Sequence, residues 1–314
     1  MELSTILSLG QTALELGLVC SLTVLALFLS YSMLNVCDLS TDGCFTLGAA
    51  VGAVVALAGH PWLSLGAAMA AGIISGFVVA VLQTRMGVNS LLAGIIVNTG
   101  LYSINIAVMG GSSMLNMNKT ETVFSIVKTA LNGISLEGAY RLLVSGAAVI
   151  AALLILTLFL RTRLGLAIRA TGNNPDMVRS SSINPAFTTT VGLCIANAFT
   201  ALSGCLLAQS QKAVDINLGT GMVTIALASL LIGGTVMGRG GVFRRAVGVV
   251  LGAIIFRLVY TVALRFNMPA FMLKLVSSVI VVLAISIPYL KAQLPMLRRR
   301  MAGRTASGAK GGRE

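Results

Sequence analysis

Long apolar runs constrain this chain more than any other feature. Nine can be marked, at about residues 13–35, 44–59, 62–83, 88–109, 141–160, 186–211, 219–238, 246–264 and 271–290. A helix needs roughly 20 apolar residues to cross about 30 Å of hydrocarbon, whereas the strands of membrane barrels alternate apolar and polar residues. The runs therefore predict an all-α polytopic membrane protein with about nine transmembrane helices. The run 44–59 is short for a full span and is a candidate half-helix.

The content and distribution of charged residues indicate a protein of the lipid bilayer rather than a nucleic-acid-binding protein. Only 10% of the 314 residues are charged, against about a quarter in a soluble domain, and the mean hydropathy is +0.94. The net charge is +13, but seven of the 22 basic residues lie in the last 24. Residues 291–314 are therefore predicted to be a disordered basic tail next to the lipid surface, and no nucleic-acid partner is expected.

Basic residues also predict the orientation, because Lys and Arg favour the cytoplasmic side. Counting outward from the arginines of residues 161–185, most other basic residues fall on the same side: Arg85, Arg239, Arg244, Arg245 and the tail. The N-terminus carries Glu2 and Glu15 and falls outside, and Arg265 is a minor exception. We predict a transmembrane domain over 1–290 with the N-terminus outside and the C-terminus in the cytoplasm. One long outer loop, at 110–140, is expected to hold a short amphipathic helix.

The chain repeats itself weakly at an offset of 178 residues. The stretch "DGCFTLGAAV" (42–51) resembles "TGMVTIALAS" (220–229), and each follows a polar break. The predicted orientation puts the first break toward the cytoplasm and the second toward the outside. Two similar units in opposite orientation are typical of transporters with inverted repeats.

Polar residues at these breaks and inside the runs are the candidates for a translocation path. Irregular backbone at membrane depth is tolerated where it is buried in protein or lines water, and acidic residues there are costly unless functional or paired. Asp42 and Thr220 are candidates both for helix caps and for path lining, and the sequence leaves both roles open. Asn98, Tyr102 and Asn105 share one helical face. The full set of candidates is Asp38, Asp42, Thr46, Asn98, Tyr102, Asn105, Asn217 and Thr220.

Other residue types indicate packing rather than chemistry. Glycines four residues apart predict close helix approach at Gly48 and Gly52, Gly72 and Gly76, and Gly248 and Gly252. Five cysteines without a CxxC pair read as small apolar residues, so neither a metal nor a cofactor is predicted. His60 precedes Trp62 in "GHPW", which indicates a turn beside an interfacial tryptophan.

The polar segment 161–185, "RTRLGLAIRATGNNPDMVRSSSINP", interrupts this oily chain. "LGLAIRAT" has the pattern of a short amphipathic helix, and we expect a break at Gly172. Asn174 then has the character of an N-cap, followed by Pro175 at the first helical position and an acidic residue in the first turn. Two capped helices at an angle would form a knob that fits a socket on a soluble partner.

Several motifs resemble a known family. The pattern G-x-A-[IL]-R-A-x-G-x-N-P-x-x-x-R, from Gly165 to Arg179, resembles the cytoplasmic coupling segment of ATP-binding-cassette importer permeases of the branched-chain amino acid and ribose type. "LNVCDLSTDGCFTLGAAV" and "GVNSLLAGIIVNTGLYSINIAVMGG" look like the subgroup of tryptophan/tyrosine permeases, and "LASLLIGGTVMGRGG" is similar to the second half of the family. The resemblance covers nearly the whole chain apart from the basic tail.

This resemblance implies a transport subunit, not an enzyme, in a bacterial cytoplasmic (inner) membrane. Two copies would form one path for an amino acid-like solute, aromatic by the subgroup's label, which a solute-binding protein delivers from outside. The sequence has no GxxxxGK[ST] phosphate loop, so ATP hydrolysis would belong to a separate ATPase chain. The residues implied in coupling to that ATPase are Arg169, Gly172, Asn174, Pro175 and Arg179.

Two other classes of transport protein share part of this pattern. An ion-driven secondary transporter also has broken helices and inverted repeats, but it usually needs acidic groups or a cation site near the midplane. The spans here hold almost no ionisable side chains, with Arg257 as the exception. A passive channel would need neither the capped knob nor an ATPase.

Overall fold

The computed structural model describes residues 3–131, 139–238 and 240–265, together with 275, 278–283 and 286. These residues are almost entirely helical. In chain order the elements are α1 (Leu3–Leu27), the π-helical turn η1 (Phe28–Met33), α2 (Thr41–Leu57), α3 (Pro61–Thr84), α4 (Ser90–Val108), β1 (Met114–Asn116), α5 (Val123–Ala130), α6 (Tyr140–Phe159), α7 (Arg163–Asn173), α8 (Pro175–Ser180), α9 (Pro185–Gln211), β2 (Ala213–Asp215), α10 (Met222–Met237) and α11 (Val242–Arg265).

The polytopic all-α prediction is confirmed, although the described residues contain fewer long spans than the nine that the sequence predicts. Eight of the nine apolar runs are helices, and six helices in the described ranges are long and apolar enough to cross a membrane: Leu9–Met33, Pro61–Thr84, Ser90–Val108, Tyr140–Phe159, Pro185–Gln211 and Val242–Ala263. The runs 44–59 and 219–238 form the shorter apolar helices α2 and α10. The ninth run, 271–290, lies mostly outside the described residues.

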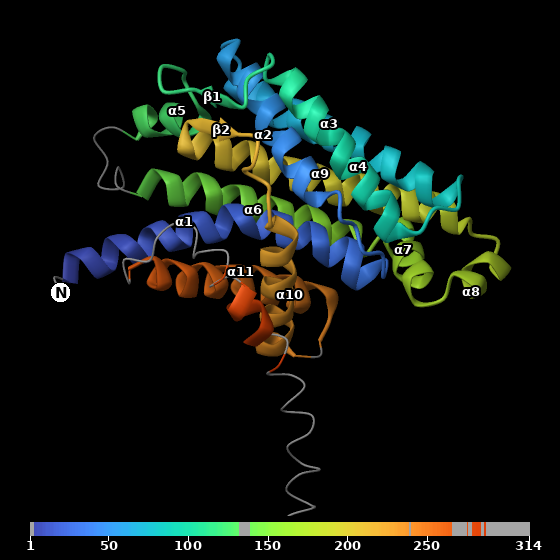
Figure 1. Ribbon diagram of the computed structural model, residues 1–314. Helices are drawn as coiled ribbons and strands as arrows, with labels where there is room; N and C mark the ends of the chain where they lie inside the picture. Colours follow the sequence, from blue (N-terminus) through green and yellow to red (C-terminus); the bar gives the residue numbers. More distant parts are fainter. Residues whose placement is uncertain are drawn as a thin grey trace, which may run out of the picture.

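A small antiparallel sheet, which the sequence did not predict, joins two distant connections. β1 pairs with β2 in the register Met114 to Asp215, Leu115 to Val214 and Asn116 to Ala213. The strands and α5 lie at one end of the helix bundle, and α7 and α8 lie at the opposite end (Figure 1). We call these the strand end and the knob end. α5 is the short amphipathic helix expected in the loop 110–140, with Val123 and Phe124 buried.

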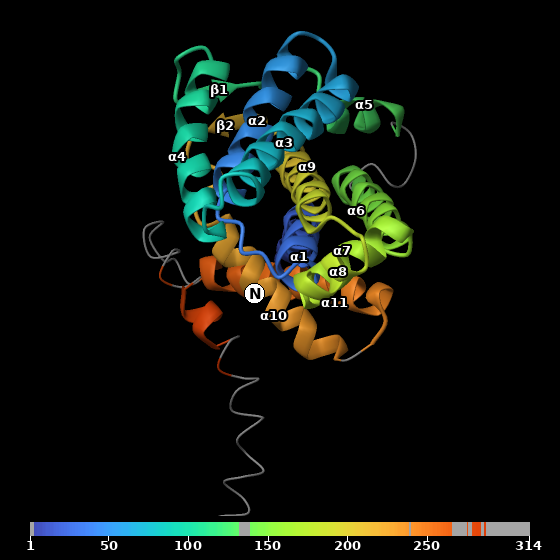
Figure 2. The same ribbon diagram turned by 90° about the vertical axis from the view of Figure 1, so that its right-hand side faces the viewer.

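α9 is the central helix of the bundle. Seen from the knob end, α1, α2, α3 and α6 surround it (Figure 2), and its most extensive contacts are with α3, α2 and α1. The span of α9 is 78% buried, whereas those of α4 and α6 are 28% buried, so these two helices lie at the periphery. A movement of any of several neighbouring helices would therefore change the contacts of side chains on α9.

The predicted glycine pairs explain how the helices come so close. A Cβ atom at Gly48 would clash with the backbone of Ala201 in α9, and one at Gly72 would clash with the carbonyl of Asn197. Gly52 and Gly76 meet α9 in the same way, and Gly248 and Gly252 meet α10. Close backbone approach maximises dispersion contacts, the main source of helix association in lipid. All three predicted pairs are confirmed as close-packing positions.

Candidate functional site

The first polar break lies between η1 and α2. After Met33 the chain leaves helical geometry, with Asn35 in the left-handed region at φ 56°, and it becomes helical again at Thr41. This non-helical stretch is partly buried in protein: Asp38 and Ser40 are buried, whereas Asn35 is exposed. Irregular backbone at membrane depth is tolerated where it is covered by protein or lines water. It places Asp38 and Asp42 at the start of the short helix α2.

Asp42 caps a helix from the other half of the chain. Its Oδ2 accepts a hydrogen bond from the backbone N–H of Gly221 (2.9 Å), and its Oδ1 accepts one from Val223 (2.8 Å). Thr46, one turn further along α2, accepts from the backbone N–H of Gly219 (3.1 Å). We call these five residues the α2–α10 junction. Its carboxylate satisfies free N–H groups at the start of α10 and lies at the positive end of the helix dipole.

This arrangement corrects the predicted caps. Asp42 was expected to cap α2, but the N-cap position of α2 is Ser40, whose side chain makes no capping bond. Thr220 was expected to cap α10, but the N-cap position is Gly221 at φ 86°, and Thr220 is exposed. Asn217 is also exposed, in a turn where its backbone N–H donates to Asp215 Oδ1 (2.7 Å). Neither Thr220 nor Asn217 is brought to the junction by its side chain.

Asp38 joins the polar break to the central helix. Its carboxylate accepts hydrogen bonds from the backbone N–H of Ser40 and from Asn197 Nδ2 in α9, both at 2.8 Å. Asp38 is 2% exposed and Asn197 1% exposed. A buried carboxylate needs such donors because desolvation is costly. Asn197 is not among the predicted site residues, and the sequence signal that could have indicated it is an amide inside a largely apolar helix.

Of the three residues on the predicted polar face of α4, two contact α2 and one does not. Asn105 is buried and its Nδ2 donates to the carbonyl of Gly43 (3.2 Å). Asn98 lies against the same glycine, where a Cβ atom would be 2.6 Å from its Oδ1. Tyr102 is 51% exposed. The structure therefore brings two of the three side chains to the start of α2, beside Asp42, and leaves the third on the periphery.

The 161–185 segment forms two short helices at the knob end. Asn174 Oδ1 accepts from the backbone N–H groups of Asp176 and Met177, both at 3.1 Å, and Pro175 is the first residue of α8. The predicted N-cap is confirmed. The break was expected at Gly172, but α7 continues through it to Asn173. Gly172 instead lets α7 approach η1, since a Cβ atom there would clash with the carbonyl of Met33.

Further contacts fasten this segment to the bundle. The hydroxyls of Thr171 in α7 and Thr188 in α9 lie 2.8 Å apart, and Ile168 is fully buried. Arg179 is exposed and Arg169 half-buried. Two apolar side chains, Leu166 and Met177, are more than half exposed beside them. The outer surface of the segment thus combines cations with exposed apolar groups, which suits a protein interface.

The arrangement offers binding and mechanical contact rather than covalent chemistry. The junction supplies a half-buried carboxylate and the starts of two short helices, and Asn98 and Asn105 of α4 lie beside it. These groups can hold polar groups by hydrogen bonds. Among the described residues, no group of three or more His, Cys, Asp or Glu side chains could hold a metal ion.

Comparison with known proteins identifies relatives along most of the chain. Residues 11–285 match the family described as "Branched-chain amino acid transport system / permease component". The tyrosine transport system permease protein of Clostridioides difficile is 30% identical over 267 residues, which cover 85% of this chain and 86% of that one. The galactose/methyl galactoside import permease protein of Haemophilus influenzae is 28% identical, over 70% of this chain and 63% of its own. No solved structure matches the chain.

Proposed function

Because the chain belongs to the family of permease components of branched-chain amino acid transport systems, we propose that it forms the translocation path of an ATP-binding-cassette importer. In this proposal two copies of the chain pair as a homodimer. A solute-binding protein delivers the solute from outside, and separate ATPase subunits supply the energy. The chain itself carries no catalytic step.

The fastened helix pair α7–α8 is the observation that carries the proposal. A loop that merely connects two spans would not need a capped second helix, a threonine pair to α9 and a glycine contact to η1. Such rigid attachment is what a force-transmitting element requires. We therefore assign the docking of an ATPase to this segment, through Arg169, Asn174, Pro175 and Arg179, with Gly172 as a positioning residue.

We further propose how movement of this segment reaches the path. α9 is held by Thr188 at the knob end and by Asn197 near the polar break. A displacement of α7 would therefore act on Asp38, and through residues 38–42 on the α2–α10 junction. The path residues are Asp38, Asp42, Thr46, Asn98 and Asn105. Tyr102, Asn217 and Thr220 are exposed in one chain and remain candidates where a second copy or a partner meets them.

The solute we propose is amino acid-like and aromatic. The support is that the relative named for tyrosine transport aligns with this chain along 86% of its own length, against 63% for the galactose permease. A half-buried carboxylate with nearby amide oxygens at Asp42, Asn98 and Asn105 also suits an ammonium group, which donates three hydrogen bonds.

The remaining topology is proposed on the same basis. We propose nine spans in a membrane domain over 1–290, an outer loop at 110–140 and a basic cytoplasmic tail over 291–314. The inverted repeat is supported by the two short helices α2 and α10, which both begin at one junction. We also propose a bacterial inner membrane with the N-terminus outside. The outer N-terminus is supported by the position of α1, which begins at the end opposite α7 and α8 (Figure 1).

One observation favours the alternative of an ion-driven transporter. Asp38 is a buried carboxylate, and the nearby oxygens Ser40 Oγ and Asn197 Oδ1 are buried without hydrogen-bond partners among the described residues. Arg257, the ionisable exception in the spans, instead donates to Cys20 Sγ (3.1 Å) in α1. Uptake that continues in ATP-depleted vesicles with an ion gradient would favour this alternative.

Purification from native membranes in mild detergent tests the proposal. We expect an ATPase to co-purify at one copy per permease and to be lost in the double variant Arg169→Glu/Arg179→Glu. Lys119→Glu, an exposed substitution at the strand end, is the matched control and should retain the ATPase. A chain that purifies alone in every detergent, or an ATPase retained by the double variant, contradicts the proposal.

A further inference from the structure

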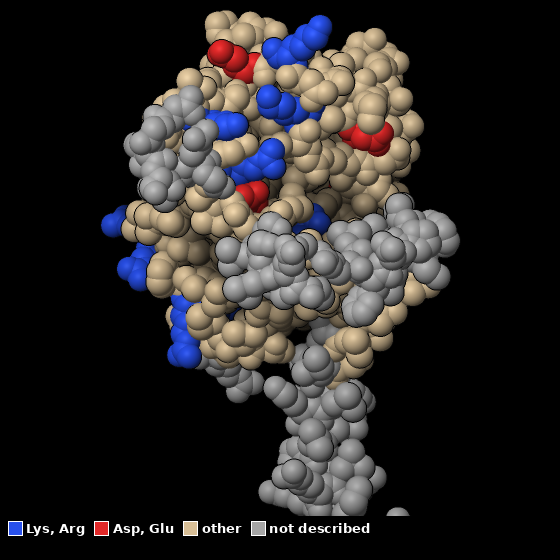
Figure 3. Space-filling view, turned by 90° about the vertical axis from the view of Figure 1, so that its left-hand side faces the viewer, with Lys and Arg blue, Asp and Glu red and all other residues tan. Residues whose placement is uncertain are grey.

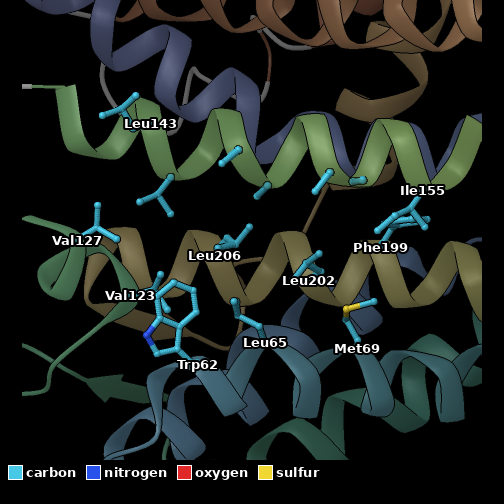
Figure 4. A pocket seen from close by; sticks show the side chains of 15 residues that line it. Trp62, Leu65, Met69, Val123, Val127, Leu143, Ile155, Phe199, Leu202 and Leu206 are labelled. Atoms are coloured by element: carbon cyan, nitrogen blue, oxygen red, sulfur yellow. The ribbon is translucent and has the colours of Figure 1, made fainter. Parts of the chain in front are cut away.

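An apolar crevice of about 470 Å³ runs along the outside of the bundle, away from the polar junction. It lies between α3, α5, α6 and α9 (Figure 4). Trp62 and Met69 line it from α3, Leu143 and Ile155 from α6, and Phe199 and Leu206 from α9. Trp62 and Ile155 are 59% and 61% exposed, so the crevice is open to the surroundings of the bundle.

The lining excludes a polar solute. Among the lining side chains the indole N–H of Trp62 is the one nitrogen or oxygen, and all others are hydrocarbon or thioether. An amino acid or sugar would lose its hydration there without gaining hydrogen bonds, which is strongly unfavourable. The occupant must therefore be apolar where it contacts this lining.

The length of the crevice matches one leaflet of a bilayer. Its lining along α6 runs from Leu143 to Ile155, which is roughly 18 Å at 1.5 Å per residue. Half of a bilayer's hydrocarbon core is about 15 Å. Leu143, Val127 and Trp62 mark one end of the crevice, and Ile155 and Phe199 lie toward the other (Figure 4). An acyl chain of one leaflet therefore fits along it.

Two cations gather at the strand end of the crevice. Lys128 Nζ lies 5.9 Å and the Arg141 guanidinium carbon 5.7 Å from the ring centroid of Tyr140. Arg141 Nε also donates to the Tyr140 hydroxyl (3.0 Å). Tyr140 precedes the lining residues Leu143 and Val144 of α6 by three and four residues, so it lies on the same helical face as they do. Figure 3 shows this end of the molecule, where basic and acidic side chains are interspersed.

We propose that this crevice binds an anionic phospholipid. One acyl chain lies between α6 and the α3–α9 pair, and the phosphate lies at Lys128, Arg141 and the Tyr140 hydroxyl. Clustered basic side chains beside a hydrophobic surface favour anionic over zwitterionic headgroups. A second copy of the chain is a poorer occupant, because it would have to bury both cations. The lipid would contact α9, the helix that carries Asn197.

Trp62 is the single tryptophan of the chain, so its fluorescence reports on this crevice directly. The full-length protein is placed in mixed micelles with phosphatidylglycerol brominated on its acyl chains, and separately with brominated phosphatidylcholine. We expect phosphatidylglycerol to quench Trp62 at mole fractions roughly tenfold lower. Lys128→Gln/Arg141→Gln should abolish this preference, whereas the control Lys119→Gln/Lys212→Gln should keep it.

A second variant separates the crevice from the surface around it. Ala148→Phe fills the crevice and leaves both cations in place, so quenching by phosphatidylglycerol should fall to the level of phosphatidylcholine. Three results overturn the proposal: equal quenching by both lipids in the unaltered protein, a preference that survives Lys128→Gln/Arg141→Gln, or a preference that survives Ala148→Phe. Self-crosslinking of an Ala151→Cys variant that protects Trp62 from both lipids would assign the crevice to a second copy instead.

Discussion

Asp42 in the first turn of α2 accepts a hydrogen bond of 2.8 Å from the backbone N–H of Val223, 181 residues further along the chain. The short helix α10 thus begins on a carboxylate that belongs to the first half of the protein. A cap supplied from within a helix follows that helix when it moves. When a cap is supplied from another helix, relative movement of the two helices must either break the hydrogen bonds or be prevented by them. This contact therefore couples α2 to α10.

Removal of this carboxylate should weaken both the fold and transport. Asp42→Ala leaves the N–H groups of Gly221 and Val223 without their acceptor, which costs about 1–3 kcal/mol. We expect inserted protein with a lowered unfolding temperature in detergent and greatly reduced uptake in vesicles. Asp215→Ala, which removes an acceptor from a surface turn, is the control and should change both quantities little. Equal effects of the two substitutions would contradict the cross-cap.

The pair Asp38 and Asn197 should be energetically coupled. Asn197→Ala leaves the buried carboxylate short of one donor and should cost about 1–3 kcal/mol in unfolding free energy. In Asp38→Ala/Asn197→Ala neither partner remains, so the loss should be smaller than the sum of the single losses by roughly 1 kcal/mol or more. Thr200→Ala, whose hydroxyl bonds within its own helix, serves as the reference. Additive losses would show that the two side chains act independently.

The sequence predicted what depends on neighbours along the chain. The apolar runs located eight helices, the Asn-Pro pair located the cap of α8, and the glycine pairs located close contacts. It did not predict what depends on distant segments. A capping pattern spans about three residues, so nothing near Asp42 indicates Val223. The three-residue strands β1 and β2 are too short for an alternating pattern to appear.

Two predicted site residues show the same limit. Gly172 looks like a helix break because glycine is a poor helix former, but its role is set by the carbonyl of Met33 in another element. Tyr102 shares a helical face with Asn98 and Asn105. However, α2 covers only part of that face, so Asn105 is buried against Gly43 while Tyr102 stays exposed. The periodicity of the sequence predicts which face of a helix is polar, but only the packing of neighbouring helices determines which residues of that face are buried.

Gly172 itself provides a further prediction. Gly172→Ala places a methyl group against the Met33 carbonyl, and such overpacking typically costs about 1–3 kcal/mol. We expect the α7–α8 pair to shift from η1 and ATP-driven uptake to fall several-fold while membrane insertion is retained. Gly146→Ala in α6, where the added Cβ meets open space, is the matched control and should be neutral or slightly stabilising. If Gly172→Ala transports as well as Gly146→Ala, the close approach to η1 is not needed for coupling.

Two asparagine caps, each followed by proline, distinguish the effect of ordering α8 on coupling from the effect of losing a helix cap elsewhere in the protein. Asn174 caps α8, and Asn184 caps α9 through the backbone N–H of Ala186 (2.9 Å). Each change to alanine should cost about 1 kcal/mol. Only Asn174→Ala should reduce ATPase binding and ATP-dependent uptake, because α8 lies on the proposed docking surface and has six residues to hold together. Asn174→Asp restores the capping oxygen and should recover both activities. Loss of coupling in Asn174→Asp as severe as in Asn174→Ala would mean that the amide contacts the ATPase directly and that its capping role is secondary.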